Sequence, residues 1–161
     1  MAIKHHLVVV CGASHNIGTS KCVLYYLSND RITSEVSFAS PYISGVTQGD
    51  DDDFLVIAGN TAYRIEHDGD GDENPELRIT NSRQLGLSHL GWDMFENFWS
   101  IGFAVARNQT NDRWHGLAIN VEHLIDDEDD DEHMVLWDVP LSGRYAFAQY
   151  NDDTVWGINW Q

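Results

Sequence analysis

The chain has 161 residues, 42% of them hydrophobic, which is enough for one domain with a buried core. Its formal net charge of −17 repels phosphate backbones, so nucleic acid is excluded as an expected partner of this acidic protein. No apolar run approaches the roughly 18 residues of a membrane span, and no signal-peptide cleavage site is evident, so we expect no membrane span and a cytoplasmic location, with secretion by a signal-independent route left open.

Short segments rich in β-branched and aromatic residues, each bounded by Gly, Asn, Asp or Pro, predict β-strands along the whole chain. In chain order they are residues 7–11, 22–27, 32–38, 54–60, 61–68, 76–81, 98–108, 114–121, 133–139, 144–151 and 154–160. Only residues 90–99 have a composition that favours a short helix. Because strands and helices do not alternate, the pattern predicts an all-β protein and excludes a doubly wound parallel sheet.

The stretch GASHNIG, within residues 12–20, has glycines spaced much as in a dinucleotide-binding turn. Such a turn must lead into an amphipathic helix, whereas the apolar run that follows favours a strand. We therefore interpret residues 12–20 as a hairpin loop. Cys11 and Cys22 then lie at the two feet of this loop, facing or nearly facing each other, and their oxidation state is left open.

An approximate repeat relates three aromatic stretches. Trp99 and Trp156 are 57 residues apart in similar strands, and Tyr42 lies 57 residues before Trp99. With this period the chain resembles the β-trefoil superfamily, which includes ricin-B-like lectins and fungal trefoil protease inhibitors. The resemblance implies three repeats of about four strands that close one barrel, with a β-sandwich as the alternative. The expected repeats are residues 1–50, 51–107 and 108–161, and the aromatic stretches supply the expected core residues Tyr42, Trp99, Ile101, Trp156 and Ile158.

Carbohydrate binding needs an aromatic face for the sugar ring together with carboxylate or amide groups for its hydroxyls. Three parts of the chain offer both kinds of group. The candidate residues are Trp92, Asp93, Asn111, Asp112, Trp114, Trp137 and Asp138. They predict a non-catalytic, lectin-like protein whose partner is a glycan or glycoprotein.

The Gln-x-Trp motif of ricin-type lectins is absent from two of the repeats, because Asn97 and Thr154 stand two residues before the tryptophans. No lectin residue can therefore be transferred from that family. The alternative function is a trefoil protease inhibitor, or an accessory subunit of a larger enzyme, that binds its protein partner through an exposed loop. The candidate loops are residues 12–20, 40–49 and 108–112.

Catalysis and metal chemistry have less support in the sequence. The eight histidines show no H-x-x-x-H spacing and no G-x-S-x-G motif occurs, so we expect no enzyme. Asp68, Asp70 and Asp72 match the first ligands of an EF-hand, but Glu73 and Ile79 replace the Gly and Glu that the loop requires. We expect no cofactor, with weak calcium binding at these three aspartates left open, and we expect the Asp-rich runs to be solvated loops.

Overall fold

The computed structural model describes the backbone of residues 2–4, 7–14, 18–28, 30–48, 53–68, 75–85, 89–98, 101–120, 135–142, 144–151 and 154–160. These residues form β-strands joined by turns, and none of them is helical. The predicted all-β class is therefore confirmed.

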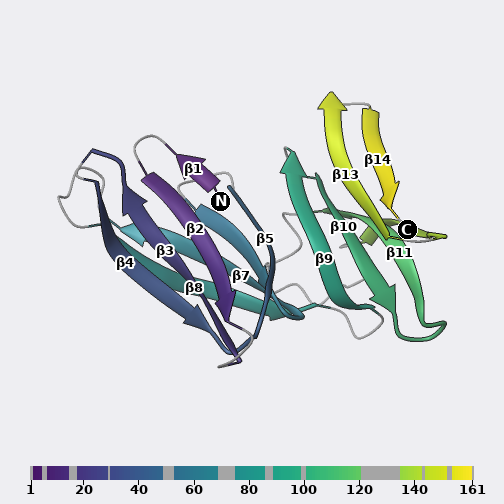
Figure 1. The fold of residues 1–161 in the computed structure, drawn as a ribbon, viewed down its shortest axis with the longest axis horizontal. Coiled ribbons are helices and arrows are strands. Elements are labelled where there is room, and N and C mark those ends of the chain that lie inside the picture. Colours follow the sequence, from purple (N-terminus) through teal and green to yellow (C-terminus); the bar gives the residue numbers. More distant parts are fainter. Residues whose placement is uncertain are drawn as a thin grey trace.

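The strands pair with their neighbours in sequence to give three four-stranded antiparallel sheets and one hairpin (Figure 1). Sheet 1 consists of β1 (Ala2–Lys4), β2 (Leu7–Ser14), β3 (Thr19–Tyr26) and β4 (Arg31–Phe38). Sheet 2 consists of β5 (Ile43–Gln48), β6 (Asp53–Ala58), β7 (Thr61–Asp68) and β8 (Glu76–Gln84). Sheet 3 consists of β9 (His89–Phe98), β10 (Ile101–Asn108), β11 (Arg113–Asn120) and β12 (Val135–Pro140). Sheet 4 is the hairpin of β13 (Arg144–Asn151) and β14 (Thr154–Trp160).

The predicted strands are largely confirmed, with one error of type. Residues 90–99 were expected to favour a helix, but most of them belong to β9, which pairs with β10 from Phe98 back to His89. The composition of this segment is compatible with either state, and pairing with a neighbouring strand overrides the local preference. The predicted Gly-Asn turn is present between β6 and β7, where Gly59 has a φ of 64°.

The trefoil arrangement is not confirmed. The four sheets begin at Ala2, Ile43, His89 and Arg144, so successive sheets start 41, 46 and 55 residues apart, and no 57-residue period is evident. Each sheet is an independent meander in which every pair of adjacent strands is antiparallel. The aromatic spacing in the sequence therefore did not correspond to the repeat that the strand pairing shows.

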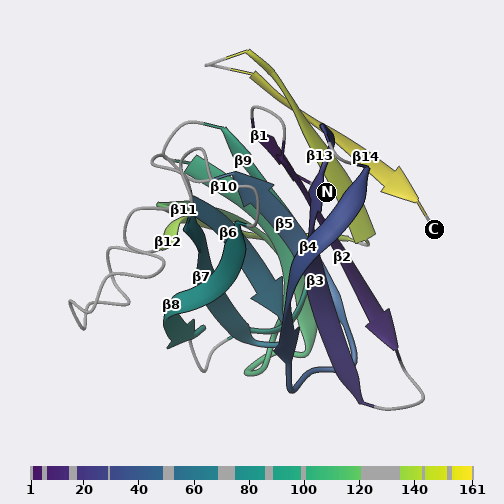
Figure 2. The same cartoon turned by 90° about the vertical axis from the view of Figure 1, so that its left-hand side faces the viewer.

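The sheets stack face to face in chain order. Buried side chains of sheet 1, such as Val9 and Leu24, form one core with Phe54 and Ile65 of sheet 2. The opposite face of sheet 2 forms a second core with sheet 3, in which Leu117 is almost fully buried. Sheet 2 is thus covered on both faces, which explains why every residue of β6 is buried. Seen from the side, the strands of sheets 1 and 2 lie in adjacent layers (Figure 2).

Strand β13 continues this stack, because it lies against β9 and β10 much as β5 lies against β1 and β2. In the described part of the chain, the first strand of each sheet therefore lies next to the first strand of the following sheet. Sheet 4 is the fourth member of the stack, although it has only two strands. The stack has two ends, sheet 1 and sheet 4.

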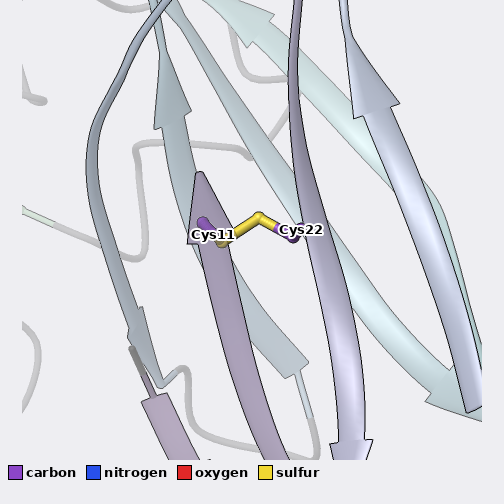
Figure 3. The surroundings of a disulfide bond; sticks show 2 residues. All are labelled: Cys11 and Cys22. Atoms are coloured by element: carbon purple, nitrogen blue, oxygen red, sulfur yellow. A yellow bond between two sulfur atoms is a disulfide. The ribbon is translucent and has the colours of Figure 1, made fainter. Parts of the chain in front are cut away.

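Cys11 and Cys22 form a disulfide bond between β2 and β3 (Figure 3). The two residues are directly opposite in the register of the hairpin, as the loop interpretation predicted. Cys22 is fully buried and belongs to the core between sheets 1 and 2, and Cys11 packs against that core. The disulfide therefore links β2 to β3 at the point where this hairpin contacts sheet 2.

Two expectations about individual residues are wrong. Tyr42, expected in the core, is 39% exposed because it lies in the turn before β5 rather than inside a sheet. Asp53, expected in a solvated acidic loop, is the buried first residue of β6, and its Oδ2 atom lies 3.0 Å from Nε of Arg64. The side chains of Trp99, Ile101, Trp156 and Ile158 lie outside the described residues.

Candidate functional site

The turn between β10 and β11 is held in one conformation by its own polar groups. The side-chain Oδ1 of Asn108 accepts hydrogen bonds from the backbone N–H of Thr110 (2.9 Å) and of Asn111 (3.4 Å). Oδ1 of Asn111 accepts another from the N–H of Arg113 at 3.0 Å. The backbone N–H of Asp112 donates to the carbonyl of Asn108, and its φ of 58° closes the turn. Asn and Asp side chains commonly stabilise turns in this way.

An Arg–Asp pair lies beside this turn. Nε of Arg107 is 2.7 Å from Oδ1 of Asp112, and Nη2 is 2.7 Å from Oδ2, so the guanidinium and carboxylate face each other with two parallel hydrogen bonds. Arg107 is directly opposite Trp114 in the register of the two strands. Opposite residues of an antiparallel pair project from the same face of the sheet. We call Arg107, Asp112 and Trp114 the Arg107 site.

A second polar group lies on the other face of β11. Nδ1 of His115 is hydrogen-bonded to Oδ1 of Asp138 on β12, and Nε2 is 3.2 Å from Nδ2 of Asn111. His115 is only 7% exposed and is opposite Ala106, a member of the core between sheets 2 and 3. A neutral imidazole with its proton on Nδ1 satisfies both contacts, donating to the carboxylate and accepting from the carboxamide.

The His115–Asp138 pair resembles the histidine and aspartate of a catalytic triad, but the group that faces Nε2 of the histidine is different. In a hydrolase, Nε2 of the histidine faces the nucleophile. Here Nε2 faces the carboxamide of Asn111. This arrangement fastens the β10–β11 turn to β12 and supports a structural role for His115.

The structure separates two adjacent candidates on β12. Successive side chains of a strand project from opposite faces, so Asp138 faces His115 and the core side while Trp137 projects from the outer face. Trp137 is 48% exposed and is opposite Ala118, on the same face as Trp114. Of the predicted residues, Asn111, Asp112, Trp114 and Asp138 are therefore brought together around the β10–β11 turn, with Trp137 farther along the sheet.

The other predicted residues have less structural description. Trp92 and Asp93 lie within β9, between Leu90 and Met94, where the pairing with β10 shifts register, and their side chains are outside the described residues. Asp68 is the last residue of β7, whereas Asp70 and Asp72 are not described. Within the described ranges, no three His, Cys, Asp or Glu side chains are grouped as a metal site requires.

Arg107 and His115 were not predicted, although the sequence contains a signal for each. A strand ending at Asn108 and another starting at Arg113 leave a four-residue turn, and that turn length places Arg107 opposite Trp114. His115 directly follows Trp114 and must therefore project from the opposite face. What the sequence does not contain is the identity of the partner strand, β12, that supplies Asp138.

Searches of protein-family models, curated proteins and solved structures give no match to this chain. The part of the chain that the structure describes contains no helix with the length and apolar character needed to cross a membrane. The function therefore has to be inferred from the geometry of the sites above.

Proposed function

We propose that the protein is a non-catalytic carbohydrate-binding protein whose ligand contacts the Arg107 site. The observation that carries the proposal is the planar Arg107–Asp112 pair, held next to Trp114 at the edge of a rigid turn. Arg107 and Asp112 have side chains that are 51% and 75% exposed, so a ligand can reach them.

Sugar hydroxyls both donate and accept hydrogen bonds, and a guanidinium next to a carboxylate offers both functions in one plane. The carboxylate accepts from one hydroxyl while the guanidinium N–H groups that do not bind Asp112 donate to a neighbouring one. Trp114 is partly exposed on the same face and supplies an apolar surface for the C–H side of a sugar ring.

The rigidity of the turn strengthens this proposal. Asn108 and Asn111 fix its backbone, and the His115–Asp138 pair fixes Asn111 in turn. A ligand that binds a preorganised loop loses less conformational entropy than one that must order the loop first. The buried network thus supports the exposed groups without touching the ligand.

A glycan array, run with calcium and then with a chelator, tests the proposal. We expect saturable binding to one family of sugars in both buffers, because the guanidinium, carboxylate and indole of the Arg107 site can contact the sugar hydroxyls and C–H groups directly. No binding in either buffer would contradict the lectin proposal. Binding that is lost when the chelator is added would contradict a site at Arg107. It would indicate a calcium-dependent site at the acidic residues Asp68, Asp70 and Asp72 instead.

A pair of matched variants then locates the site. Asp112→Gly removes the carboxylate while keeping a residue that tolerates a φ of 58°, and Asp30→Gly makes the same change at another exposed turn with a φ of 52°. Hydrogen bonds to charged groups are worth about 1.5–3 kcal/mol, so we expect Asp112→Gly to weaken sugar binding about 10- to 100-fold. Asp30→Gly should bind like the parent chain, and equal loss in both variants argues against the Arg107 site.

A protein partner is the second candidate, and the rigid, exposed turn of residues 109–112 is the observation that favours it. The other two predicted loops are largely strand. Residues 43–48 of the 40–49 segment form β5, and the turn before it is fixed by buried Ser40, which is hydrogen-bonded to Tyr42. In the 12–20 segment, residues 12–14 and 19–20 belong to β2 and β3 and continue the hairpin beyond the disulfide bond. Inhibition of a member of a protease panel, lost in Asp112→Gly but not in Asp30→Gly, would favour this candidate over a glycan.

A further inference from the structure

Asn111 makes two contacts through opposite ends of its carboxamide. Its Oδ1 atom accepts a hydrogen bond from the backbone N–H of Arg113 at 3.0 Å, and its Nδ2 atom lies 3.2 Å from Nε2 of His115. A backbone N–H can only donate, so the carboxamide oxygen must face Arg113 and the NH2 group must face His115. The main chain of the turn therefore fixes the orientation of the Asn111 side chain.

This orientation makes Nε2 of His115 a hydrogen-bond acceptor. The NH2 group of Asn111 can only donate, and an imidazole nitrogen accepts only when it carries no proton. The proton of the neutral ring then lies on Nδ1, where the carboxylate of Asp138 accepts it. The contacts on both sides of the ring thus agree on one tautomer. A second proton, added at Nε2, would point at the NH2 group of Asn111.

Protonation of His115 therefore sets two donors against each other at a buried position. His115 is 7% exposed, and an N–H group that meets another donor in such a place is costly. Rotation of the Asn111 carboxamide brings Oδ1 to the Nε2–H group, but it removes the acceptor from the N–H of Arg113. The imidazolium and the main chain of the turn thus compete for one oxygen. The imidazolium is the stronger donor, because hydrogen bonds from charged groups are roughly twice as strong as neutral ones.

The described charged groups around His115 are compatible with both states of the ring. The carboxylate of Asp138 on β12 contacts the ring and balances the charge of an imidazolium. Arg113 is two residues before His115 on the same face of β11 and is exposed, and β10 places the uncharged Ala106 opposite His115. On the side of sheet 2 that faces sheet 3, the charged residues are Asp53, Glu66, Arg64 and Arg83. Two acids and two bases sum to zero and favour neither state.

We propose that His115 is a pH switch for the β10–β11 turn, and through the turn for the Arg107 site. Histidine changes charge between about pH 8 and pH 5. At the upper end of this range the neutral ring accepts from Asn111 and the turn is closed. As the pH falls, His115 takes up a proton at Nε2, the Asn111 carboxamide rotates, and the N–H of Arg113 loses its acceptor. Asp112 lies between Asn111 and Arg113, so its carboxylate is then no longer held opposite Arg107.

Nuclear magnetic resonance of the isotopically labelled chain, recorded from about pH 8 to pH 5, tests the switch without any ligand. We expect the ring nitrogens of His115 to show the Nδ1–H tautomer at the upper pH. The backbone N–H signal of Arg113 should move upfield as the ring takes up its proton, with the same midpoint. The N–H of Gly59, which donates to the carbonyl of Tyr42, is the internal control and should keep its position.

Two results of this titration would overturn the proposal. One is an Arg113 signal that stays in place while His115 becomes protonated, since the turn would then not respond to the ring. The other is a ring that remains neutral over the whole range. Movement of the Gly59 signal with the same midpoint would also contradict the proposal, because the acid response would then extend beyond the β10–β11 turn.

Asn111→Asp separates the switch from other effects of acid, because a carboxylate has two acceptor oxygens. One oxygen keeps the bond to the N–H of Arg113 while the other accepts from the imidazolium, so we expect the Arg113 signal to lose its pH dependence. His67→Gln is the matched control, since His67 is a histidine of β7 whose ring lies near Phe54, away from this turn. An acid response that persists in Asn111→Asp, or that is lost in His67→Gln, would overturn the proposal.

Sugar binding at the same pH values tests whether the switch acts on the Arg107 site, and this part of the inference rests on the proposed function. We expect the dissociation constant to rise about 10-fold in acid for the parent chain and to stay nearly constant for Asn111→Asp. Binding to the parent chain that does not depend on pH would overturn the coupling to the Arg107 site. A chain that binds no sugar at any pH contradicts the proposed function, whereas the resonance titration decides the switch by itself.

Discussion

Reduction of the Cys11–Cys22 disulfide is expected to destabilise the fold by a calculable amount. The two cysteines are 11 residues apart in sequence, and closing a loop of that length in the unfolded chain is worth about 2.8 kcal/mol at 25 °C in the chain-entropy description. A chain of about this size loses about 2–4 °C in Tm per kcal/mol, so reduction should lower the Tm by about 6–11 °C. Because the register already places the two cysteines opposite each other, we expect the reduced chain to keep the same fold.

Urea unfolding, followed by tryptophan fluorescence with and without a reducing agent, measures this difference. The double variant Cys11→Ala/Cys22→Ala is the control, since its stability must not respond to the reducing agent. The unfolding free energy should fall with urea concentration at a similar rate in both forms of the parent chain. The rate should be somewhat higher for the reduced chain, because it exposes a larger surface on unfolding. Equal unfolding free energies for the oxidised and reduced parent chain would refute the argument, and a response of the double variant would show that the reducing agent acts elsewhere.

Three further predictions test the packing described above. Gly18→Ala and Gly59→Ala both place a side chain at a φ near 65°, but only at Gly59 does the new Cβ lie 3.0 Å from Oγ of Ser40. We expect thermal unfolding to show that the unfolding free energy falls by about 1–2 kcal/mol in Gly18→Ala and by more in Gly59→Ala. His115→Ala removes both contacts of the imidazole and should cost about 1–3 kcal/mol in urea unfolding, and an unchanged stability contradicts its structural role. Phe54→Ala empties a fully buried position between sheets 1 and 2 and should cost about 3–5 kcal/mol in the same assay, whereas the exposed Ile79→Ala should cost much less.

Local patterns in the sequence were sufficient for most of the secondary structure. Alternation over residues 32–38 and the Gly-Asn turn at Gly59 depend on neighbours within a few positions, and both predictions agree with the structure. The opposition of Cys11 and Cys22 followed from the same local reasoning about a hairpin loop. The error at residues 90–99 arose where composition alone favoured a helix and pairing with β10 decided for a strand.

The candidate site was predictable from the sequence only in part, because some of its contacts join residues that are distant along the chain. Asn111, Asp112 and Trp114 are close in sequence, and a hairpin turn necessarily keeps them close in space. Asn111 contacts His115, and His115 is hydrogen-bonded to Asp138, which lies 23 residues further along the chain. The contact with Asp138 exists only because β12 pairs with β11. No local pattern specifies that pairing.

The sequence by itself determined that this chain is all-β and that the hairpin around residues 12–20 brings two cysteines together. Only the tertiary structure decided which face of each strand is buried, because alternation defines two faces without saying which one another sheet will cover. Trp137 and Ile32 are therefore exposed while Leu117 and Phe54 are not. That choice depends on contacts between sheets far apart along the chain, and local sequence cannot encode it on its own.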